Sequence, residues 1–182
     1  MFSHSSLFPL VSGLLPFTRG ECRIAIGEPA PEFRLLDQNR TIHELSEYRG
    51  RWLVLYFYPK DDTPGCRAEA CSFQQDLSRL HEMGVELLGI STDTVSSHLK
   101  FADRFHLSFP LLADEAGEVA ASYGSLFKLG PLKFAKRRTF VIDPDGNVAA
   151  IFRKVDPDLH SEEVVAALLR LDDSKANQPR PG

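Results

Sequence analysis

The chain has 182 residues, 43% of them hydrophobic, and a formal net charge of −4. This length suits one domain with a sizeable core and is too short for two domains of ordinary size. No block of like charge suits a nucleic acid, and the longest apolar run, Trp52–Tyr58, is far below the roughly 20 residues of a membrane-spanning helix. We therefore expect a soluble protein with neither nucleic-acid nor membrane partners.

Residues 1–23 differ in composition from the rest of the chain. Residues 1–20 contain no Asp or Glu, several Ser and one Arg, which faintly resembles a transit peptide. They lack the several arginines of a transit peptide, and also the basic start and small-residue cleavage site of a secretory signal. Three interpretations stay open: a dispensable extension, an organelle-targeting segment, or an export segment.

From residue 24 onward, the hydrophobic patterning and turn residues predict strands that alternate with helices. Two short strands within 32–42 form an N-terminal hairpin, and Arg51–Tyr58 is apolar on both faces, as in a buried central strand. The other expected elements are helices at 44–48, 64–83, 93–106, 115–123 and 159–171, strands at 85–92, 109–112, 138–143 and 148–153, and a loop at 125–136.

This order of elements predicts the α/β class, with a mixed central β-sheet flanked by helices. It is compatible with a thioredoxin-like fold, although periodicity alone does not separate that fold from other small α/β folds. We expect the domain to span residues 24–171, followed by a flexible polar tail at 172–182.

Three cysteines, Cys22, Cys66 and Cys71, make an odd and sparse set. A secreted disulfide scaffold usually carries a larger and even number, so the set fits a reducing, cytoplasmic compartment. In such a compartment a cysteine pair is more often redox-active than structural. Cys22 lies in the N-terminal segment and is expected to be a bystander thiol.

Cys66 is predicted to lie in the first turn of a helix, because Thr63 suits the N-cap and Pro64 the first helical position. Free backbone N–H groups and the positive end of the helix dipole favour a thiolate there, and Arg67 adds to this. Gly65 lets a substrate or backbone approach closely. The alternative is a buried structural cysteine, which is the common state of a free Cys.

The spacing of Cys66 and Cys71 limits what the pair can do. Five residues of intact helix separate the two Cα atoms by about 8.6 Å, beyond the roughly 7 Å that a disulfide tolerates. Either Cys71 is an ordinary core residue, or the two form a redox couple that requires local unwinding of the helix.

No metal or cofactor site is expected. His81, His98, His106 and His160 lack the spacing of metal ligands, and no second pair of ligands accompanies the cysteines. There is no Gly-rich phosphate loop and no Gly-x-Ser-x-Gly elbow.

The run Pro59-x-x-x-Thr63-x-x-Cys66 resembles the active-site signature of peroxiredoxins, and Cys71 matches the Q-type (bacterioferritin comigratory protein-like) atypical 2-Cys subgroup. The resemblance covers about residues 24–171. It extends to segments that follow in the family's order: Gly27–Phe33, Gly89–Asp93, His98-x-x-Phe101, Phe109–Asp114, Tyr123-Gly124 and Arg137–Asp143.

The resemblance implies a role for five residues. Cys66 is the peroxidatic thiolate and Cys71 resolves its oxidised form. Thr63 hydrogen-bonds the sulfur or the peroxide oxygen, Pro59 shields the site from water, and Arg137 is the active-site arginine that favours the thiolate and orients the peroxide.

Arg138 is adjacent, but strand alternation points it to the opposite face from Arg137. Glu69 is expected to orient Arg137. The sequence departs from the family at two places. Phe73-Gln74-Gln75-Asp76 replaces the Phe-Arg-Asp of many relatives, and residues 125–136 differ from the sequence that is common in the family.

The function implied is reduction of hydrogen peroxide and organic hydroperoxides to water and alcohols. Cys66 sulfenic acid and a Cys66–Cys71 disulfide are the intermediates, and thioredoxin or a similar dithiol reductant restores the thiols. The resemblance favours a monomer. One alternative is a peroxide-sensing or chaperone-like protein on the same scaffold; another is a disulfide oxidoreductase, although the Cys-x-x-Cys of that chemistry is absent.

Overall fold

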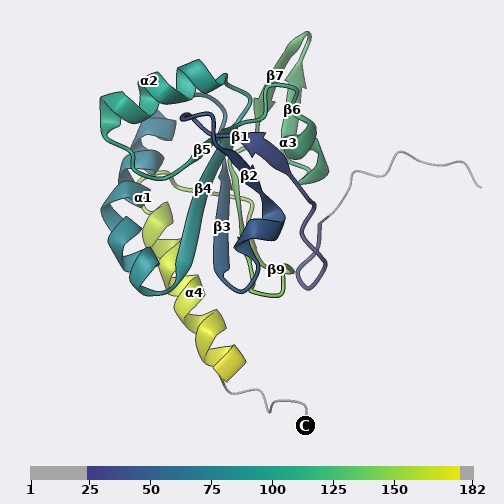
Figure 1. Cartoon of the computed structure of the whole chain (residues 1–182), viewed down its shortest axis with the longest axis vertical. Helices are drawn as coiled ribbons and strands as arrows, with labels where there is room; N and C mark the ends of the chain where they lie inside the picture. Colours follow the sequence, from purple (N-terminus) through teal and green to yellow (C-terminus); the bar gives the residue numbers. More distant parts are fainter. Residues whose placement is uncertain (1–23, 177–182) are drawn as a thin grey trace, which may run out of the picture.

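The computed structural model describes residues 24–176, which form a central five-stranded sheet covered by helices on both faces (Figure 1). The strands, in the order in which they lie side by side, are β5 (Leu111–Ala113), β4 (Val85–Ser91), β3 (Trp52–Phe57), β8 (Arg138–Ile142) and β9 (Val148–Phe152). The first three run parallel, whereas β8 is antiparallel to both of its neighbours. The sheet is therefore mixed, as predicted.

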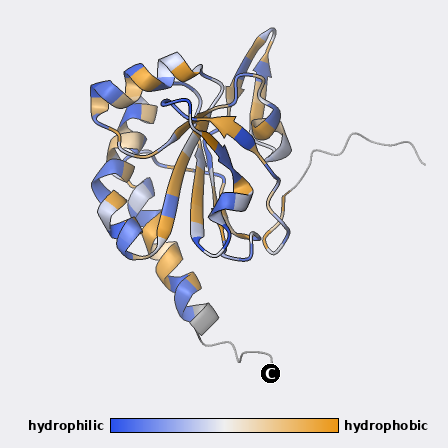
Figure 2. Ribbon diagram, viewed as in Figure 1, coloured by the Kyte–Doolittle hydropathy of each residue, from blue (hydrophilic) through white to orange (hydrophobic). Residues whose placement is uncertain are grey.

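Five helical segments surround the sheet. They are the 3-10 helix η1 (Leu45–Tyr48) and the α-helices α1 (Pro64–Glu82), α2 (Val95–Phe105), α3 (Glu118–Ser122) and α4 (His160–Ala176) within the described residues. The hydropathy colours of Figure 2 show that the central strands are mainly hydrophobic, whereas α1, α2 and α4 carry hydrophilic residues as well.

The central strand β3 serves two cores because successive side chains point to opposite faces of a sheet. All six of its residues are buried. Val54 and Tyr56 pack into one core with residues of α1, α2 and α4. Leu55 and Phe57 pack into the other with residues of η1 and α3. The expectation of a strand buried from both sides is confirmed.

Two hairpins lie outside the central sheet. The predicted N-terminal hairpin is present as β1 (Arg34–Leu36) and β2 (Ile42–Glu44). The loop predicted at 125–136 is wrong, because β6 (Leu126–Leu129) and β7 (Leu132–Ala135) form a second antiparallel hairpin there. Gly130 takes a positive φ of 58° in the tight turn, so the Gly-Pro pair marks a hairpin turn rather than a long loop.

Two helices differ from the predictions by three or more residues at one end. α3 begins at Glu118 rather than at residue 115, after Gly117 with a φ of 71°, and the Asp114 carboxylate accepts hydrogen bonds from the N–H groups of Val119 and Ala120. α4 continues to Ala176, five residues past the expected end of the helix, so the stretch 172–176 is helical rather than a flexible tail. Its polar residues include neither Gly nor Pro to end the helix.

Residues 1–23 and 177–182, and with them Cys22, lie outside the described residues. Within 24–176, no helix combines the length and the hydropathy that crossing a membrane requires.

Candidate active site

Cys66 lies where the sequence places it, at the beginning of α1, which follows the central strand β3 after a short loop. Pro64 is the first helical residue, and Thr63 takes the extended backbone of an N-cap. The first bond of the helix joins Arg67 N–H to Thr63 C=O at 2.9 Å, so Cys66 belongs to the first turn. The Cys66 side chain is buried, with 1% of the residue exposed.

Thr63 does not cap the helix with its side chain. Its hydroxyl donates instead to the carbonyl oxygen of Lys60, at 3.1 Å. The predicted N-cap position is therefore right, but the predicted side-chain role is absent. The Thr63 side chain therefore accepts no hydrogen bond from the N–H groups of the first turn. Free N–H groups at the start of a helix suit the binding of an anionic sulfur or oxygen.

Arg137 is the residue that the fold brings to the sulfur. Its Nη2 lies 3.2 Å from Cys66 Sγ and donates to it. Its Nη1 donates to Oε2 of Glu69, one turn further along α1. A guanidinium that donates to a sulfur favours its anionic form, and the second bond fixes the orientation of the planar group.

Glu69 is fully buried, and its carboxylate accepts fewer hydrogen bonds than its two oxygens allow. Oε1 has no hydrogen-bond partner among the described residues. Burial raises the pKa of Glu69 to about 7, although Arg137 lowers it. Desolvation lowers the pKa of the Arg137 guanidinium, but Glu69 and then Cys66 outweigh it and the net shift is upward. Glu69 therefore exchanges its proton near neutral pH.

Gly65 has a specific use that differs from the expected one. A Cβ atom on Gly65 would lie 3.2 Å from Arg137 Nη2 and 3.6 Å from Pro157 Cγ. The missing side chain thus admits the guanidinium to the start of the helix, rather than only a substrate or backbone. Pro157, in the segment before α4, is a neighbour of the site that the sequence did not indicate.

The neighbouring arginine has a different environment. Nη1 of Arg138 donates to the carbonyl oxygen of Gly124 at 2.6 Å, away from the sulfur. Arg137, directly before β8, and Arg138, its first residue, therefore contact different parts of the molecule, as the alternation of side chains in extended chain predicts.

The two cysteines are both free thiols, and the helix between them is intact. Cys71 is half-buried. Directly after it, the hydroxyl groups of Ser72 and Ser161 lie 2.6 Å apart and join α1 to α4. Cys66 and Cys71 therefore cannot form a disulfide unless α1 unwinds locally.

Pro59 and Tyr56 complete the surroundings. Pro59 is half-buried immediately after Tyr58, beyond the end of β3. The Tyr56 hydroxyl is buried and has no partner within the described chain. Burial raises the pKa of Tyr56, and Glu69 and Cys66 raise it further. The sequence indicated Tyr56 only as part of a buried strand. The one sequence feature that could have suggested a role near Cys66 is a Tyr, with its hydroxyl group, at a buried position where a Phe would pack equally well.

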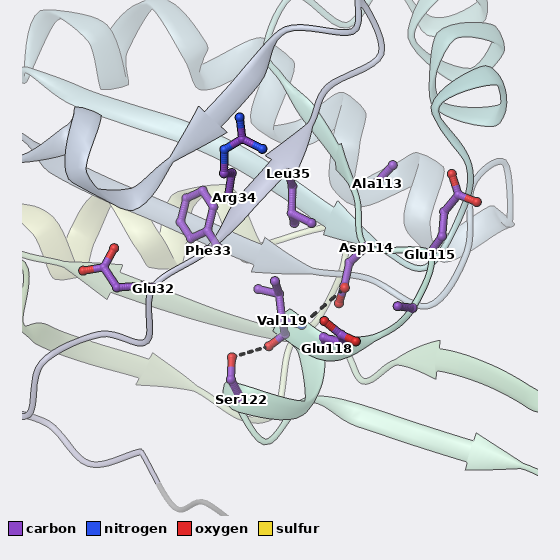
Figure 3. Close-up of a pocket in the computed structure, with 11 residues that line it drawn as sticks. Glu32, Phe33, Arg34, Leu35, Ala113, Asp114, Glu115, Glu118, Val119 and Ser122 are labelled. Atoms are coloured by element: carbon purple, nitrogen blue, oxygen red, sulfur yellow. Dashed lines mark hydrogen bonds between the residues drawn. The ribbon is translucent and has the colours of Figure 1, made fainter.

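A separate groove of about 480 Å³ lies between β1 and α3 (Figure 3). Glu32, Arg34 and Glu118 are among its polar residues, and Phe33 and Val119 belong to the core on the face of β3 opposite Cys66. Cys66, Thr63, Glu69 and Arg137 do not line this groove, so it is separate from the surroundings of the Cys66 sulfur. No group of three or more His, Cys, Asp and Glu side chains within residues 24–176 could hold a metal ion.

The chain is similar to known proteins in sequence and in fold. The model of the AhpC/TSA family matches residues 26–151. Chloroplastic peroxiredoxin Q of Sedum lineare is 35% identical over 174 residues, covering 93% of this chain and 91% of that protein. The crystal structure of peroxidoxin BcpB from Mycobacterium tuberculosis has a TM-score of 0.76 and 34% identity, covering 86% of this chain and 100% of that one.

A further solved structure is the bacterioferritin comigratory protein of Xanthomonas campestris, studied for its alkyl peroxide reduction activity in trapped intermediate/ligand complexes. It has a TM-score of 0.72 and 32% identity, covering 76% of this chain and 90% of that one. These likenesses confirm the expected thioredoxin-like fold.

Proposed function

The chain belongs to the AhpC/TSA family as a peroxiredoxin of the Q (Bcp) type, and we propose that Cys66 is its peroxidatic residue. As a member of this family it is a thiol-dependent peroxidase, an oxidoreductase that reduces peroxides at the expense of thiols. The observation that carries the assignment of Cys66 is the 3.2 Å contact between its sulfur and Arg137 Nη2 in the first turn of α1.

In the first step the Cys66 thiolate attacks one oxygen of the peroxide. The S–O bond forms as the O–O bond breaks, the sulfur is oxidised to sulfenic acid, and the leaving oxygen takes a proton to become water or an alcohol. Arg137 and the N–H groups of the first helical turn stabilise the charge that develops on the oxygens. Thr63 offers a hydroxyl to the sulfur or the peroxide, and Pro59 limits the access of water.

In the second step the Cys71 thiol loses its proton and attacks the sulfenic sulfur; the S–S bond forms as the S–O bond breaks, and the hydroxyl group takes up a proton and leaves as water. This requires the first two turns of α1 to unwind, because the intact helix holds the two residues too far apart. A dithiol reductant, thioredoxin or a similar protein, then restores both thiols by exchange. The alkyl peroxide activity of the Xanthomonas relative supports organic hydroperoxides as substrates beside hydrogen peroxide.

The remaining assignments belong to the same proposal. The protein acts as a monomer in the cytoplasm, its catalytic domain begins at residue 24, and Glu69 orients Arg137. The bond between Glu69 and Arg137 supports the last assignment. Residues 1–23 are not needed for the chemistry.

The test measures peroxide consumption with thioredoxin, thioredoxin reductase and NADPH for the wild type, Cys66→Ser and Cys71→Ser. We expect steady turnover in the wild type and none in Cys66→Ser. Cys71→Ser should oxidise once per molecule and then stop, because nothing resolves the sulfenic acid. Turnover that persists in Cys66→Ser would overturn the proposal, and undiminished turnover in Cys71→Ser would overturn the role of the second cysteine.

A further inference from the structure

The loop between β3 and α1 is tied to the body of the protein by the buried carboxylate of Asp61, whose side chain is 5% exposed, among other contacts. Tyr58 Oη donates to Oδ1 at 2.8 Å, and Ser97 Oγ donates to Oδ2 at 2.6 Å. His98 Nδ1 lies 2.9 Å from the same Oδ2. Five positions before Cys66, the chain is therefore fixed by three side chains, two of which come from α2.

His98 is the central member of this group because both of its ring nitrogens face an acceptor. The residue is fully buried. Nε2 lies 3.2 Å from the carbonyl oxygen of Leu112, which can only accept, so Nε2 carries a hydrogen. Nδ1 faces the Asp61 carboxylate. The ring thus links the loop to α2, its own helix, and to β5 on the far side.

Further contacts hold the same loop. Asp61 N–H donates to Oδ2 of Asp93 at 2.8 Å, and Asp93 in turn accepts from Ser91 Oγ at 2.8 Å. Asp62 adopts a positive φ of 55° and forms an ion pair with Arg104 of α2. Thr63 and Pro64 follow directly, so this anchoring sets where α1 begins.

The segment that carries the two cysteines lies between this anchor and a second one. After Cys71, the hydroxyl pair of Ser72 and Ser161 joins α1 to α4, and the rings of Phe73 and His160 pack edge to face at 5.4 Å. Within the segment, Arg137 holds Cys66 and Glu69. Since oxidation changes the sulfur that Arg137 contacts, this inner contact is the one that the reaction itself weakens.

We propose that Asp61 and His98 are positioning residues for peroxide reduction: they hold the loop Pro59–Thr63 in place, both in the reduced enzyme and while the first turns of α1 unwind. The proposal rests on the proposed function of Cys66, because the position of this loop affects catalysis only if Cys66 is the residue that reacts with peroxide. Its two consequences are separate. Loss of the anchor misplaces the start of α1 relative to Arg137 and slows the first oxidation, and it also exposes the loop amides.

Two substitutions of His98 separate a positioning role from simple core packing. The side-chain amide of His98→Asn can donate near the place of Nδ1 and keep the bond to Asp61, but it loses the bond to Leu112. His98→Gln can donate near the place of Nε2 and does the reverse. The two variants each lose one bond and have similar polarity, so each is the matched control of the other.

Two measurements follow. Hydrogen exchange of the peptide that spans residues 59–72 reports the anchoring without reference to any reaction. Rapid-mixing kinetics report the second-order rate of Cys66 oxidation by hydrogen peroxide. We expect His98→Asn to resemble the wild type in both, whereas His98→Gln exchanges faster in this peptide and oxidises about tenfold more slowly, the effect of one lost charge-assisted bond.

Equal behaviour of the two variants, whether both normal or both impaired, would overturn the proposal. If His98→Gln does not fold, Ser97→Ala removes a single donor to Asp61 and should show the same two changes in smaller measure; unchanged exchange in Ser97→Ala would then count against the anchor. Faster exchange in His98→Gln together with no peroxide consumption by the wild type would leave the anchor standing and reject the function of Cys66.

Discussion

Cys66 and Arg137 are 71 positions apart in the chain, yet the sulfur of one and Nη2 of the other lie 3.2 Å apart. The contact exists because β8 pairs antiparallel with β3, which brings the start of β8 beside the end of β3 and hence beside the start of α1. The guanidinium also binds Glu69, so its position is determined by two residues of the same helix.

Replacing Arg137 tests this bridging geometry. Arg137→Lys keeps the charge but cannot contact Cys66 and Glu69 at once, because an ammonium group lacks the planar fork of a guanidinium. We expect the rate of Cys66 oxidation to fall about 100-fold, the scale of a lost transition-state donor. Competition kinetics against a reference peroxidase measure this rate. Arg138→Lys is the neighbouring control, and an equal loss in that variant would contradict the special position of Arg137.

Gly65→Ala should separate activity from stability. The new Cβ would lie 3.2 Å from Arg137 Nη2, so the guanidinium has to move away from the sulfur and the rate of Cys66 oxidation should fall. Alanine is the better helix former by about 1 kcal/mol, so the free energy of unfolding should not drop. Urea unfolding and rapid-mixing kinetics on the same samples check both halves. A variant with full activity would mean that the arginine accommodates the methyl group.

Glu69 makes the folded state less stable as pH rises. Its pKa is raised from 4.5 to about 7 in the folded protein, so between these values the folded state keeps a proton that the unfolded state has lost. The free energy of unfolding contributed by this group therefore decreases from about pH 4.5 to about pH 7 and is constant above. Glu69→Gln should remove that decrease, as measured by urea unfolding at several pH values. An identical pH profile in Glu69→Gln would contradict the raised pKa of Glu69.

His160 acts in the opposite direction. Burial lowers its pKa from 6.5 to about 4, so the unfolded state binds a proton in this range that the folded state does not. Stability is consequently lost as pH falls from about 6.5 to about 4. His160→Gln can keep the bond to Thr139 Oγ1 without titrating. We expect its free energy of unfolding to decrease less than that of the wild type as the pH falls from about 6.5 to about 4. An equal decrease in both proteins would rule out His160 as the source of this pH dependence.

These two groups overlap between about pH 4.5 and 6.5, where their effects have opposite signs. The wild type should therefore show a flatter profile in this window than either variant. In Glu69→Gln the contribution of His160 should emerge, with stability rising with pH. In His160→Gln the contribution of Glu69 should emerge, with stability falling with pH. Profiles of equal slope in the two variants would be inconsistent with both assignments.

Local sequence determined the centre of the fold and the position of Cys66 in the first turn of a helix. Trp52–Tyr58 is apolar at every second and every intervening position, which favours a strand buried on both faces. Thr63 and Pro64 mark the start of a helix through backbone preferences that act within a few residues. The spacing of five then predicts that Cys66 and Cys71 cannot meet in the intact helix, and the free thiols agree with it.

The tertiary structure decided the contacts that join distant segments. The Gly-Pro pair at 130–131 is compatible with a loop or with a tight hairpin turn, and pairing of the flanking strands selects the hairpin. Likewise, nothing near Gly65 in the sequence shows that its missing side chain admits Arg137, and nothing near Asp61 shows that His98 completes its bonding. Propensities and helix caps act between neighbours in the chain, whereas hydrogen bonds between buried groups depend on which elements the sheet brings together.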